Sequence, residues 1–186
     1  MRAAEQEPTG LAFSEVVTLH QQGIYTYLLR LTHNPHDAQD LFQETFLKAC
    51  RAYASLSPQA DHKAWLFRIA TNLAKNYFRD GKRRGRVIVS NKQLYGPEVE
   101  CYPHKAAGAE AAVISQETIR IVLAAIEALP FRQRAAFLQR KFEGLSYETI
   151  AANLGCSGQT ARAHVYQALR KIRLWLDQHS SGKKGA

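Results

Sequence analysis

The sequence has little of what marks a secreted, metal-binding or membrane-spanning protein. Its three cysteines, Cys50, Cys101 and Cys156, are far apart, and no two form a C-x-x-C pair. A disulfide framework is therefore not expected, and Cys101 with His104 has poor spacing for zinc, so we expect no metal and no cofactor. No apolar run reaches about 18 residues and no signal peptide is visible, which predicts a soluble, cytoplasmic protein with no direct membrane insertion.

The signatures of catalysis are also missing. The sequence has no glycine-rich loop for phosphates, no cluster of metal ligands and no nucleophile with an adjacent base. An active site needs such groups, so we expect a protein that is not an enzyme and has no small-molecule substrate. Strand patterns are nearly absent, whereas apolar residues recur at helical spacing almost throughout, and this predicts an all-α fold.

One polar stretch, residues 87–112, interrupts the helical pattern. Glycines and prolines punctuate it at Gly96, Pro97, Pro103 and Gly108. This composition favours a flexible linker between two small helical domains, residues 1–86 and 113–186. The first domain is expected to contain helices over about residues 11–32, 37–53 and 63–79. The apolar positions expected to be buried on the last of these are Leu66, Ile69, Ala70, Leu73 and Tyr77. The second domain resumes with an apolar pattern at Ile119, Val122, Leu123, Ile126 and Leu129.

Positive charge is concentrated in two segments of the chain. The net charge is +9, from 25 Lys and Arg against 16 Asp and Glu. Residues 63–86 and 132–186 each carry a net charge of +7, and the segments that precede them are acidic. Two separated basic segments suit contact with a polyanion at two sites, because each neutralised phosphate releases counterions. A membrane surface is the alternative partner, but neither segment has the pattern of an amphipathic lipid anchor.

Residues 144–173 have the pattern of a helix-turn-helix. Ser146 is a good N-cap for a short helix that buries Ile150, Ala151 and Leu154, and Gly155 permits the tight turn after it. A second helix is expected from about Gly158 to Leu176. Its apolar stripe comprises Ala161, Val165, Ala168, Leu169 and Ile172. The first turns of such a helix can enter the major groove of DNA, where Arg and Gln bond to base edges. An ordinary helical hairpin with a solvated basic face is the alternative.

Three motifs carry a resemblance to a known family. They are Asp37–Phe46, Trp65–Tyr77 and the pair Leu129-Pro130 ahead of the helix-turn-helix. In this order and at these separations they resemble bacterial sigma factors of the extracytoplasmic-function (ECF) group, in the sigma-70 family. The resemblance covers most of the chain. It implies a promoter-specificity subunit of RNA polymerase, with region 2 in the first domain and region 4 in the second, that directs transcription initiation and aids promoter melting.

The first motif is an acidic segment. Asp37, Asp40, Gln43 and Glu44 recur at spacings that line one side of a helix. The resemblance implies that this segment docks on the β′ clamp helices of the RNA polymerase core. Its polymerase-binding residues would be Asp37, Asp40, Leu41, Gln43, Glu44 and Phe46, with Leu41 and Phe46 among or behind the contacts. From the residues alone, a solvated acidic face is the alternative.

The second motif and the basic cluster after it would meet the −10 element. Cationic and amide side chains along a helix can contact phosphates and bases. The resemblance implies that the melted strand contacts His62, Lys63, Lys75, Asn76, Arg79, Arg83 and Arg84. A flipped base would be held by the loop from Ser55 to Lys63, beside Asn76. Trp65 and Asn72 could capture an unstacked base, but their helical spacing within an apolar pattern favours a structural role.

The second domain would read the −35 element. By resemblance, the DNA-binding residues there are Arg134, Ser157, Gln159, Thr160, Arg162, Ala163, Tyr166 and Gln167. The promoter DNA would thus be bound both as a duplex and as a melted strand. His164 is left open between a phosphate contact and a surface histidine.

Two other classes of protein compete with this interpretation. A repressor or activator could use the same helix-turn-helix without polymerase, and would usually dimerise on a palindromic site. The acidic segment and the separate basic helix argue against it, because a simple repressor needs neither. The third class is an interaction protein held by an inhibitory partner. For a sigma factor this is complementary, since an anti-sigma factor is an expected partner and the linker would let two domains clamp around it.

Overall fold

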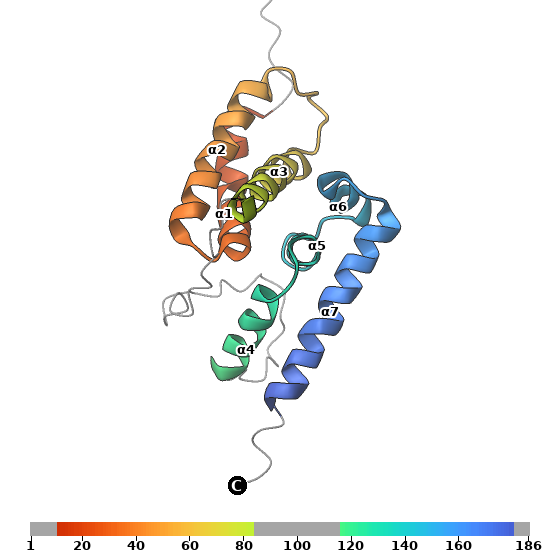
Figure 1. The fold of residues 1–186 in the computed structure, drawn as a ribbon. Coiled ribbons are helices and arrows are strands. Elements are labelled where there is room, and N and C mark those ends of the chain that lie inside the picture. Colours follow the sequence, from red (N-terminus) through yellow and green to blue (C-terminus); the bar gives the residue numbers. More distant parts are fainter. Residues whose placement is uncertain (1–10, 84–115, 181–186) are drawn as a thin grey trace, which may run out of the picture.

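The computed structural model describes residues 11–83 and 116–180, which form seven helices and no strand (Figure 1). The all-α prediction is confirmed. The expected linker lies outside the described residues, as do Arg84, Cys101 and His104. No helix within the two described ranges is long and apolar enough to cross a membrane.

Helices α1 (Phe13–Thr32), α2 (Pro35–Tyr53) and α3 (His62–Arg83) form an N-terminal group. Asn34 defines the start of α2, because its side chain accepts hydrogen bonds from the backbone N–H groups of His36 and Asp37 at 2.9 and 3.4 Å. Pro35 suits the first helical position, where no N–H is needed. Helix α3 continues past residue 79, where the sequence predicted its end, because Gly81 is tolerated inside it.

The core of this group is wider on α3 than the sequence predicted. Leu66, Ala70 and Leu73 are buried as expected, but Phe67, which was not in the predicted stripe, is only 1% exposed. Its ring meets that of Tyr27 edge-on at 5.1 Å between centroids. Because α1, α2 and α6 all pack on α3, more than one stripe of this helix is covered.

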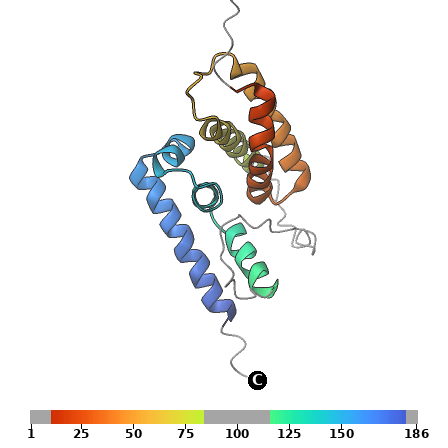
Figure 2. The same ribbon diagram turned by 180° about the vertical axis from the view of Figure 1, so that it is seen from behind.

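Helices α4 (Gln116–Glu127), α5 (Phe131–Lys141), α6 (Tyr147–Leu154) and α7 (Gly158–Ser180) form a C-terminal group. The long α7 runs past the other three, which pack along it (Figure 2). The buried line on α7 consists of Ala161, Val165, Ala168 and Ile172, as predicted. Leu169 and Ile119 were expected in apolar stripes but are 40% and 37% exposed. Leu169 lies one residue further round the helix than Ala168, which already faces the core.

The two groups of helices are in direct contact. Helix α5 lies against α1, and α6 lies against α3 (Figures 1 and 2). The sequence pattern predicted two domains joined by a linker, but it gave no indication of a contact between them. The contact buries polar side chains from the C-terminal group, including Arg134 and Gln139.

A buried pair at this contact makes stability depend on pH. Arg134 Nη1 lies 2.8 Å from His33 Nε2, so the arginine donates to a neutral imidazole. Burial, reinforced by the charge of Arg134, lowers the pKa of His33 to about 4. An unfolded histidine titrates near pH 6.5, so the unfolded chain binds more protons between these values. The stabilisation is therefore complete above about pH 6.5 and is lost as the pH falls through this window.

Because of His33 alone, we expect the free energy of unfolding to be about 1 kcal/mol lower at pH 5.5 than at pH 7. Urea unfolding at the two pH values measures this. His33→Asn should remove that part of the pH dependence, because asparagine does not titrate and tolerates the left-handed φ of 53° found here. His36→Asn, at an exposed position of α2, is the matched control. Equal pH dependence in His33→Asn and the natural chain would contradict the assignment.

Candidate nucleic-acid and protein interfaces

The helix-turn-helix has the turn chemistry that the sequence predicted. The Ser146 side chain accepts from the N–H of Thr149 at 3.1 Å and begins α6. Gly155 ends it in the left-handed region, with φ of 62°. Ser157 Oγ then accepts from the N–H of Thr160 at 3.1 Å in the first turn of α7. These three residues fix the angle at which α7 leaves α6.

Gly155→Ala should destabilise the helix-turn-helix by about 1 kcal/mol, because a Cβ is strained at this positive φ. A lower midpoint of urea unfolding would measure the loss. Gly158→Ala is the matched control, since Gly158 has no positive φ and its added Cβ meets nothing within 4 Å. Equal stability of the two variants would show that the turn does not depend on glycine.

The first turns of α7 present a continuous exposed surface. Its exposed side chains are Gln159, Thr160, Arg162, Ala163, Tyr166 and Gln167. Tyr166 is 68% exposed. The Arg162 guanidinium lies 4.9 Å from the centroid of the Tyr147 ring, which holds it beside the turn. Gln167 Oε1 accepts from Gln133 Nε2 at 2.8 Å, which leaves the Gln167 amide nitrogen to donate elsewhere.

Arg134 does not belong to this surface. It is 7% exposed and donates to His33 Nε2 and, at 3.2 Å, to the backbone carbonyl of Glu127. The structure therefore brings seven of the eight predicted −35 residues together at α7 and its turn, and separates Arg134 from them. Helical periodicity could not have predicted the burial of Arg134, because its partner His33 lies 101 residues away in the sequence.

Helix α3 carries a polar stripe on its outer face. Lys75, Asn76 and Arg79 are exposed on it, as the prediction requires, and Arg68 and Asn72 extend the stripe by two turns. The interpretation of Asn72 as structural was wrong, since its side chain is exposed. Trp65 is half-buried beside the Tyr53 ring, with 6.2 Å between centroids, in agreement with a structural role.

The remaining predicted −10 residues lie elsewhere. His62 begins α3, with its ring centroid 5.8 Å from that of Tyr53. Lys63 points to the C-terminal group, where it meets Glu143. Arg83 ends α3 and its side chain is outside the described part of the structure, as is all of Arg84. The structure thus gathers Lys75, Asn76 and Arg79, and separates Lys63 from them.

The acidic face of α2 is exposed. Asp40, Gln43 and Glu44 point outward, and Glu44 pairs with Lys48 at 3.0 Å. Asp37 accepts from the Tyr77 hydroxyl at 2.6 Å. Leu41 is 6% exposed and Phe46 is half-buried against Phe42, so both support the face from behind.

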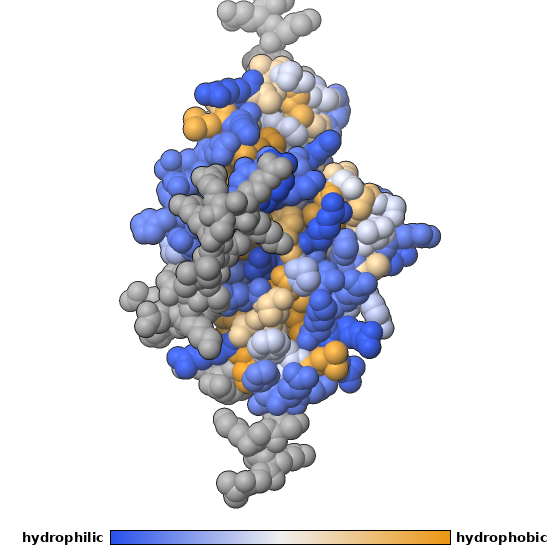
Figure 3. All heavy atoms as spheres, viewed as in Figure 1, coloured by the Kyte–Doolittle hydropathy of each residue, from blue (hydrophilic) through white to orange (hydrophobic). Residues whose placement is uncertain are grey.

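Sequence reasoning missed one residue of the α2 face. Leu47 is 58% exposed and follows Asp40, Gln43 and Glu44 at seven, four and three residues. That spacing could have identified it as part of the same side of the helix. The molecular face in Figure 3 is mostly hydrophilic, with isolated hydrophobic side chains. Leu47 therefore adds an exposed apolar side chain to the C-terminal end of this face.

A cleft of about 700 Å³, lined by apolar and cationic side chains and by Glu127, lies between the two groups of helices. Lys75 and Arg79 of α3, Arg132 and Arg134 of α5, and His164 of α7 are among its lining residues. Burial, and then the charge of Arg132, lower the pKa of His164. In the described residues, no three His, Cys, Asp or Glu side chains gather where they could hold a metal ion.

Comparisons with known proteins identify the family of the chain. Residues 16–84 match the family described as Sigma-70 region 2, and residues 119–172 match that described as Sigma-70, region 4. The chain is 32% identical to the ECF RNA polymerase sigma factor SigE of Mycolicibacterium smegmatis over 94% of its length and 70% of the relative's. It is 33% identical to the RNA polymerase sigma-H factor of Pseudomonas aeruginosa over 87% of its length and 84% of the relative's.

The fold is also similar to a solved structure. The sigma factor RpoE of Bartonella quintana, in complex with the anti-sigma factor NepR, superposes with a TM-score of 0.64 and 24% sequence identity. The match covers 89% of this chain and 96% of that one. Regions 2 and 4 correspond to the two groups of helices, α1–α3 and α4–α7. The chain therefore belongs to the sigma-70 family, as an ECF sigma factor that directs RNA polymerase to promoters.

Proposed function

We propose that three separate helical surfaces divide the work of this sigma factor. The observation that carries the proposal is that α2, α3 and α7 each expose a stripe of different chemistry. These stripes are acidic on α2, cationic with amides on α3, and amide, hydroxyl and guanidinium on α7. One surface suits a basic protein partner and two suit nucleic acid.

The α2 face would bind the polymerase core. Asp40, Gln43 and Glu44 offer charge and hydrogen bonds to the β′ clamp helices, and Leu47 offers apolar area at the C-terminal end of the same face. Charged rims steer association, whereas a buried apolar side chain slows dissociation. Leu41 and Phe46 would act indirectly, by holding the helix in place.

The α3 stripe would bind the −10 element and its melted strand. Lys75 and Arg79 can neutralise phosphates, and the amides of Asn72 and Asn76 can bond to the edge of an unstacked base. An unstacked base is stabilised only if a protein surface replaces its lost stacking and pairing. Promoter melting would then be driven by binding free energy, with no catalytic group.

The exposed surface of α7 would bind the −35 element in the major groove. Arg162 and Gln159 have side chains that can make two hydrogen bonds to a base edge, and Gln167 can donate one from its amide nitrogen. Ser157 and Thr160 lie at the N-terminal end of α7, where their hydroxyls can reach phosphates. Tyr166 would supply contact area to bases or sugars.

An anti-sigma factor is the regulatory partner that we propose. The similarity in fold to a sigma factor solved with the anti-sigma factor NepR supports this. Such a protein would cover the α2 face and so compete directly with the polymerase core. We also propose that the factor acts in the cytoplasm, where its polymerase and promoter are found.

Size-exclusion chromatography of the purified chain with sigma-free polymerase core tests the proposed function. Stable co-elution is expected. Elution of the folded, inhibitor-free chain entirely apart from the core would overturn the proposal and favour an autonomous DNA-binding regulator.

A further inference from the structure

The Arg162 guanidinium is held on an aromatic ring in the chain without DNA. Its central carbon lies 4.9 Å from the centroid of the Tyr147 ring. Arg162 is exposed near the start of α7, whereas Tyr147 is half-buried at the start of α6. A guanidinium over a ring is attracted by the negative charge of the ring face. The contact therefore joins the two helices of the helix-turn-helix through a residue of the exposed α7 surface.

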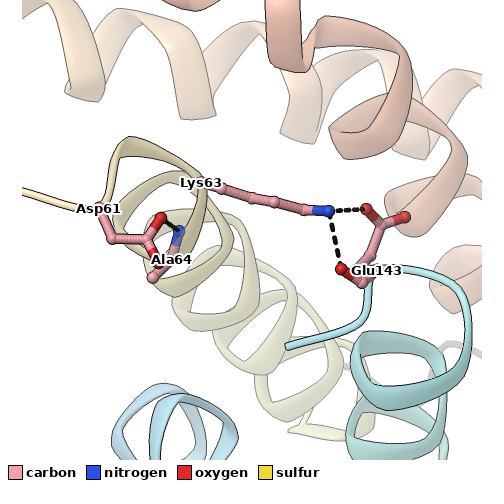
Figure 4. Close-up of polar contacts among 4 residues, drawn as sticks. All are labelled: Asp61, Lys63, Ala64 and Glu143. Carbon is pink, nitrogen blue, oxygen red and sulfur yellow. Dashed lines mark hydrogen bonds and ion pairs between the residues drawn. The ribbon is translucent and has the colours of Figure 1, made fainter. Parts of the chain in front are cut away.

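The Tyr147 ring is itself fixed in place by its surroundings. It packs against the apolar core, and the Arg140 guanidinium of α5 lies 4.8 Å from its centroid. Arg140 Nη1 donates to the backbone carbonyl of Leu145, in the loop before α6, at 3.0 Å. The same loop is tied to α3, because Lys63 Nζ donates to the Glu143 backbone carbonyl at 2.7 Å (Figure 4). The ring can therefore act as a rigid support.

The contact with the ring leaves the hydrogen-bonding groups of Arg162 available. Within the described residues, no acceptor makes a hydrogen bond or an ion pair with Arg162. A guanidinium carries five N–H donors in a rigid fork. An ion pair with a carboxylate would use these donors, whereas attraction to a ring does not require them. Arg162 is thus restrained in position while its donors stay open to an acceptor from outside the chain.

Glu148, next to Tyr147 in the sequence, balances part of the positive charge here. Hydrogen bonds from its own backbone and from Ser146, and then the charges of Arg162 and Arg140, lower the pKa of Glu148. Glu148 is therefore ionised at neutral pH. Its charge offsets part of the repulsion between the two guanidinium groups that share the Tyr147 ring.

A restrained arginine is better suited to discriminate between bases than a mobile one. An exposed arginine has many rotamers, and a base contact that orders it loses this freedom. A side chain that is already held in place loses less on binding, so more of the contact energy remains. The acceptor pair O6 and N7 of guanine matches the guanidinium fork in the major groove. Restraint of Arg162 therefore favours recognition of one base over nonspecific contact with phosphates.

We propose that Tyr147 is a positioning residue for base recognition by Arg162. Its ring holds the guanidinium in place before DNA is bound, so that Arg162 contributes specificity as well as charge. This role rests on the proposed function, in which the exposed surface of α7 binds the −35 element. It adds a residue outside α7 that determines how sharply the element is recognised.

Two variants at position 147 separate the ring from the rest of the side chain. Tyr147→Leu removes the ring face, while an apolar side chain still packs on the core. Tyr147→Phe is the conservative variant, which keeps the ring and removes only the hydroxyl. It therefore also tests whether that hydroxyl contacts DNA directly. Urea unfolding of both variants measures any loss of stability independently of DNA binding.

Nuclear magnetic resonance of the free full-length chain tests the restraint without DNA. Relaxation of the arginine Nε–H groups reports side-chain motion on the picosecond to nanosecond timescale. Arg162 should be more ordered than Arg170, an exposed arginine about two turns further along α7 that contacts no ring in the described part of the chain. The difference should persist in Tyr147→Phe and disappear in Tyr147→Leu. An Arg162 as mobile as Arg170 in the natural chain would overturn the proposal, and this result needs no variant to fold.

Selection from a pool of duplexes with a random central segment tests the effect on base recognition. Each variant is assembled with polymerase core, and the bound duplexes are sequenced. Tyr147→Leu should weaken the base preference about 3- to 10-fold, only at positions that Arg162→Ala also affects. Tyr147→Phe should retain the preference of the natural chain. Adding Tyr147→Leu to Arg162→Ala should cause no further loss, because Tyr147 acts through Arg162.

These outcomes separate the positioning role from the proposed function. Loss of base preference in Arg162→Ala but not in Tyr147→Leu would overturn the positioning role alone. Equal losses in Tyr147→Phe and Tyr147→Leu would also overturn it, because the hydroxyl would then contact DNA directly. Unchanged base preferences in Arg162→Ala would instead overturn base recognition by Arg162 in the proposed function, whatever the order of its side chain in the free chain.

Discussion

Phe67→Ala is expected to lower the free energy of unfolding by about 3 to 5 kcal/mol. The Phe67 ring is 1% exposed and packs edge-on against Tyr27 in the core. Removing it loses the transfer free energy of the ring and leaves a cavity that helices packed from three sides cannot close. Urea unfolding followed by circular dichroism measures the change.

Leu47→Ala is the control for this loss. It also shortens a large apolar side chain, but Leu47 is 58% exposed on α2, so its expected effect is below about 0.5 kcal/mol. Similar unfolding midpoints for the two variants would contradict the assignment of Phe67 to the core.

Asp40→Ala and Arg162→Ala are expected to separate the two binding functions. Arg162→Ala should weaken binding to −35 duplex DNA about 10- to 100-fold, because a guanidinium that pairs with a base edge contributes about 1 to 3 kcal/mol of discrimination. It should leave binding to the polymerase core unchanged. Asp40→Ala should do the reverse, with core binding weakened several-fold through the loss of a charge on the α2 face. Fluorescence anisotropy with labelled DNA and titration of labelled core measure the two affinities.

Each of these variants has a control on its own helix. Gln39→Ala changes an exposed residue next to Asp40 that is outside the predicted face. Arg173→Ala removes an exposed arginine about three turns beyond Arg162, roughly 16 Å along α7 and away from its N-terminal turns. Matching defects in both assays for Asp40→Ala and Arg162→Ala would refute the division of labour between α2 and α7.

Local interactions along the chain determine the helix-turn-helix and the exposed helix faces, so the sequence alone could predict these features. The helix-turn-helix follows from a hydroxyl cap at Ser146, a left-handed glycine at Gly155 and a second cap at Ser157. Each of these acts within a few residues of its own position, so no knowledge of the tertiary structure is needed. The same holds for the exposed faces of α2 and α3, which follow from spacing along a single helix.

Which residues are buried at the edges of the predicted stripes could be determined only from the tertiary structure. Phe67 is covered because three helices pack on α3, whereas Leu169 is left open because Ala168 already fills the contact on α7. Helical periodicity indicates one face, but the number of neighbours determines how wide the buried face becomes. Asn72 lies within an apolar run of the sequence but is exposed, because no helix of the described residues packs on its side of α3.

The sequence determined the all-α fold, the helix-turn-helix and the chemistry of three surfaces, since these depend on spacing within about four residues. The tertiary structure alone decided that the two groups of helices meet, and that Arg134 and Lys63 lie at their junction rather than on an open face. The physical reason is distance along the chain. The Arg134–His33, Gln139–Tyr27 and Lys63–Glu143 contacts join residues 80 to 112 positions apart, and no periodicity reaches across such separations.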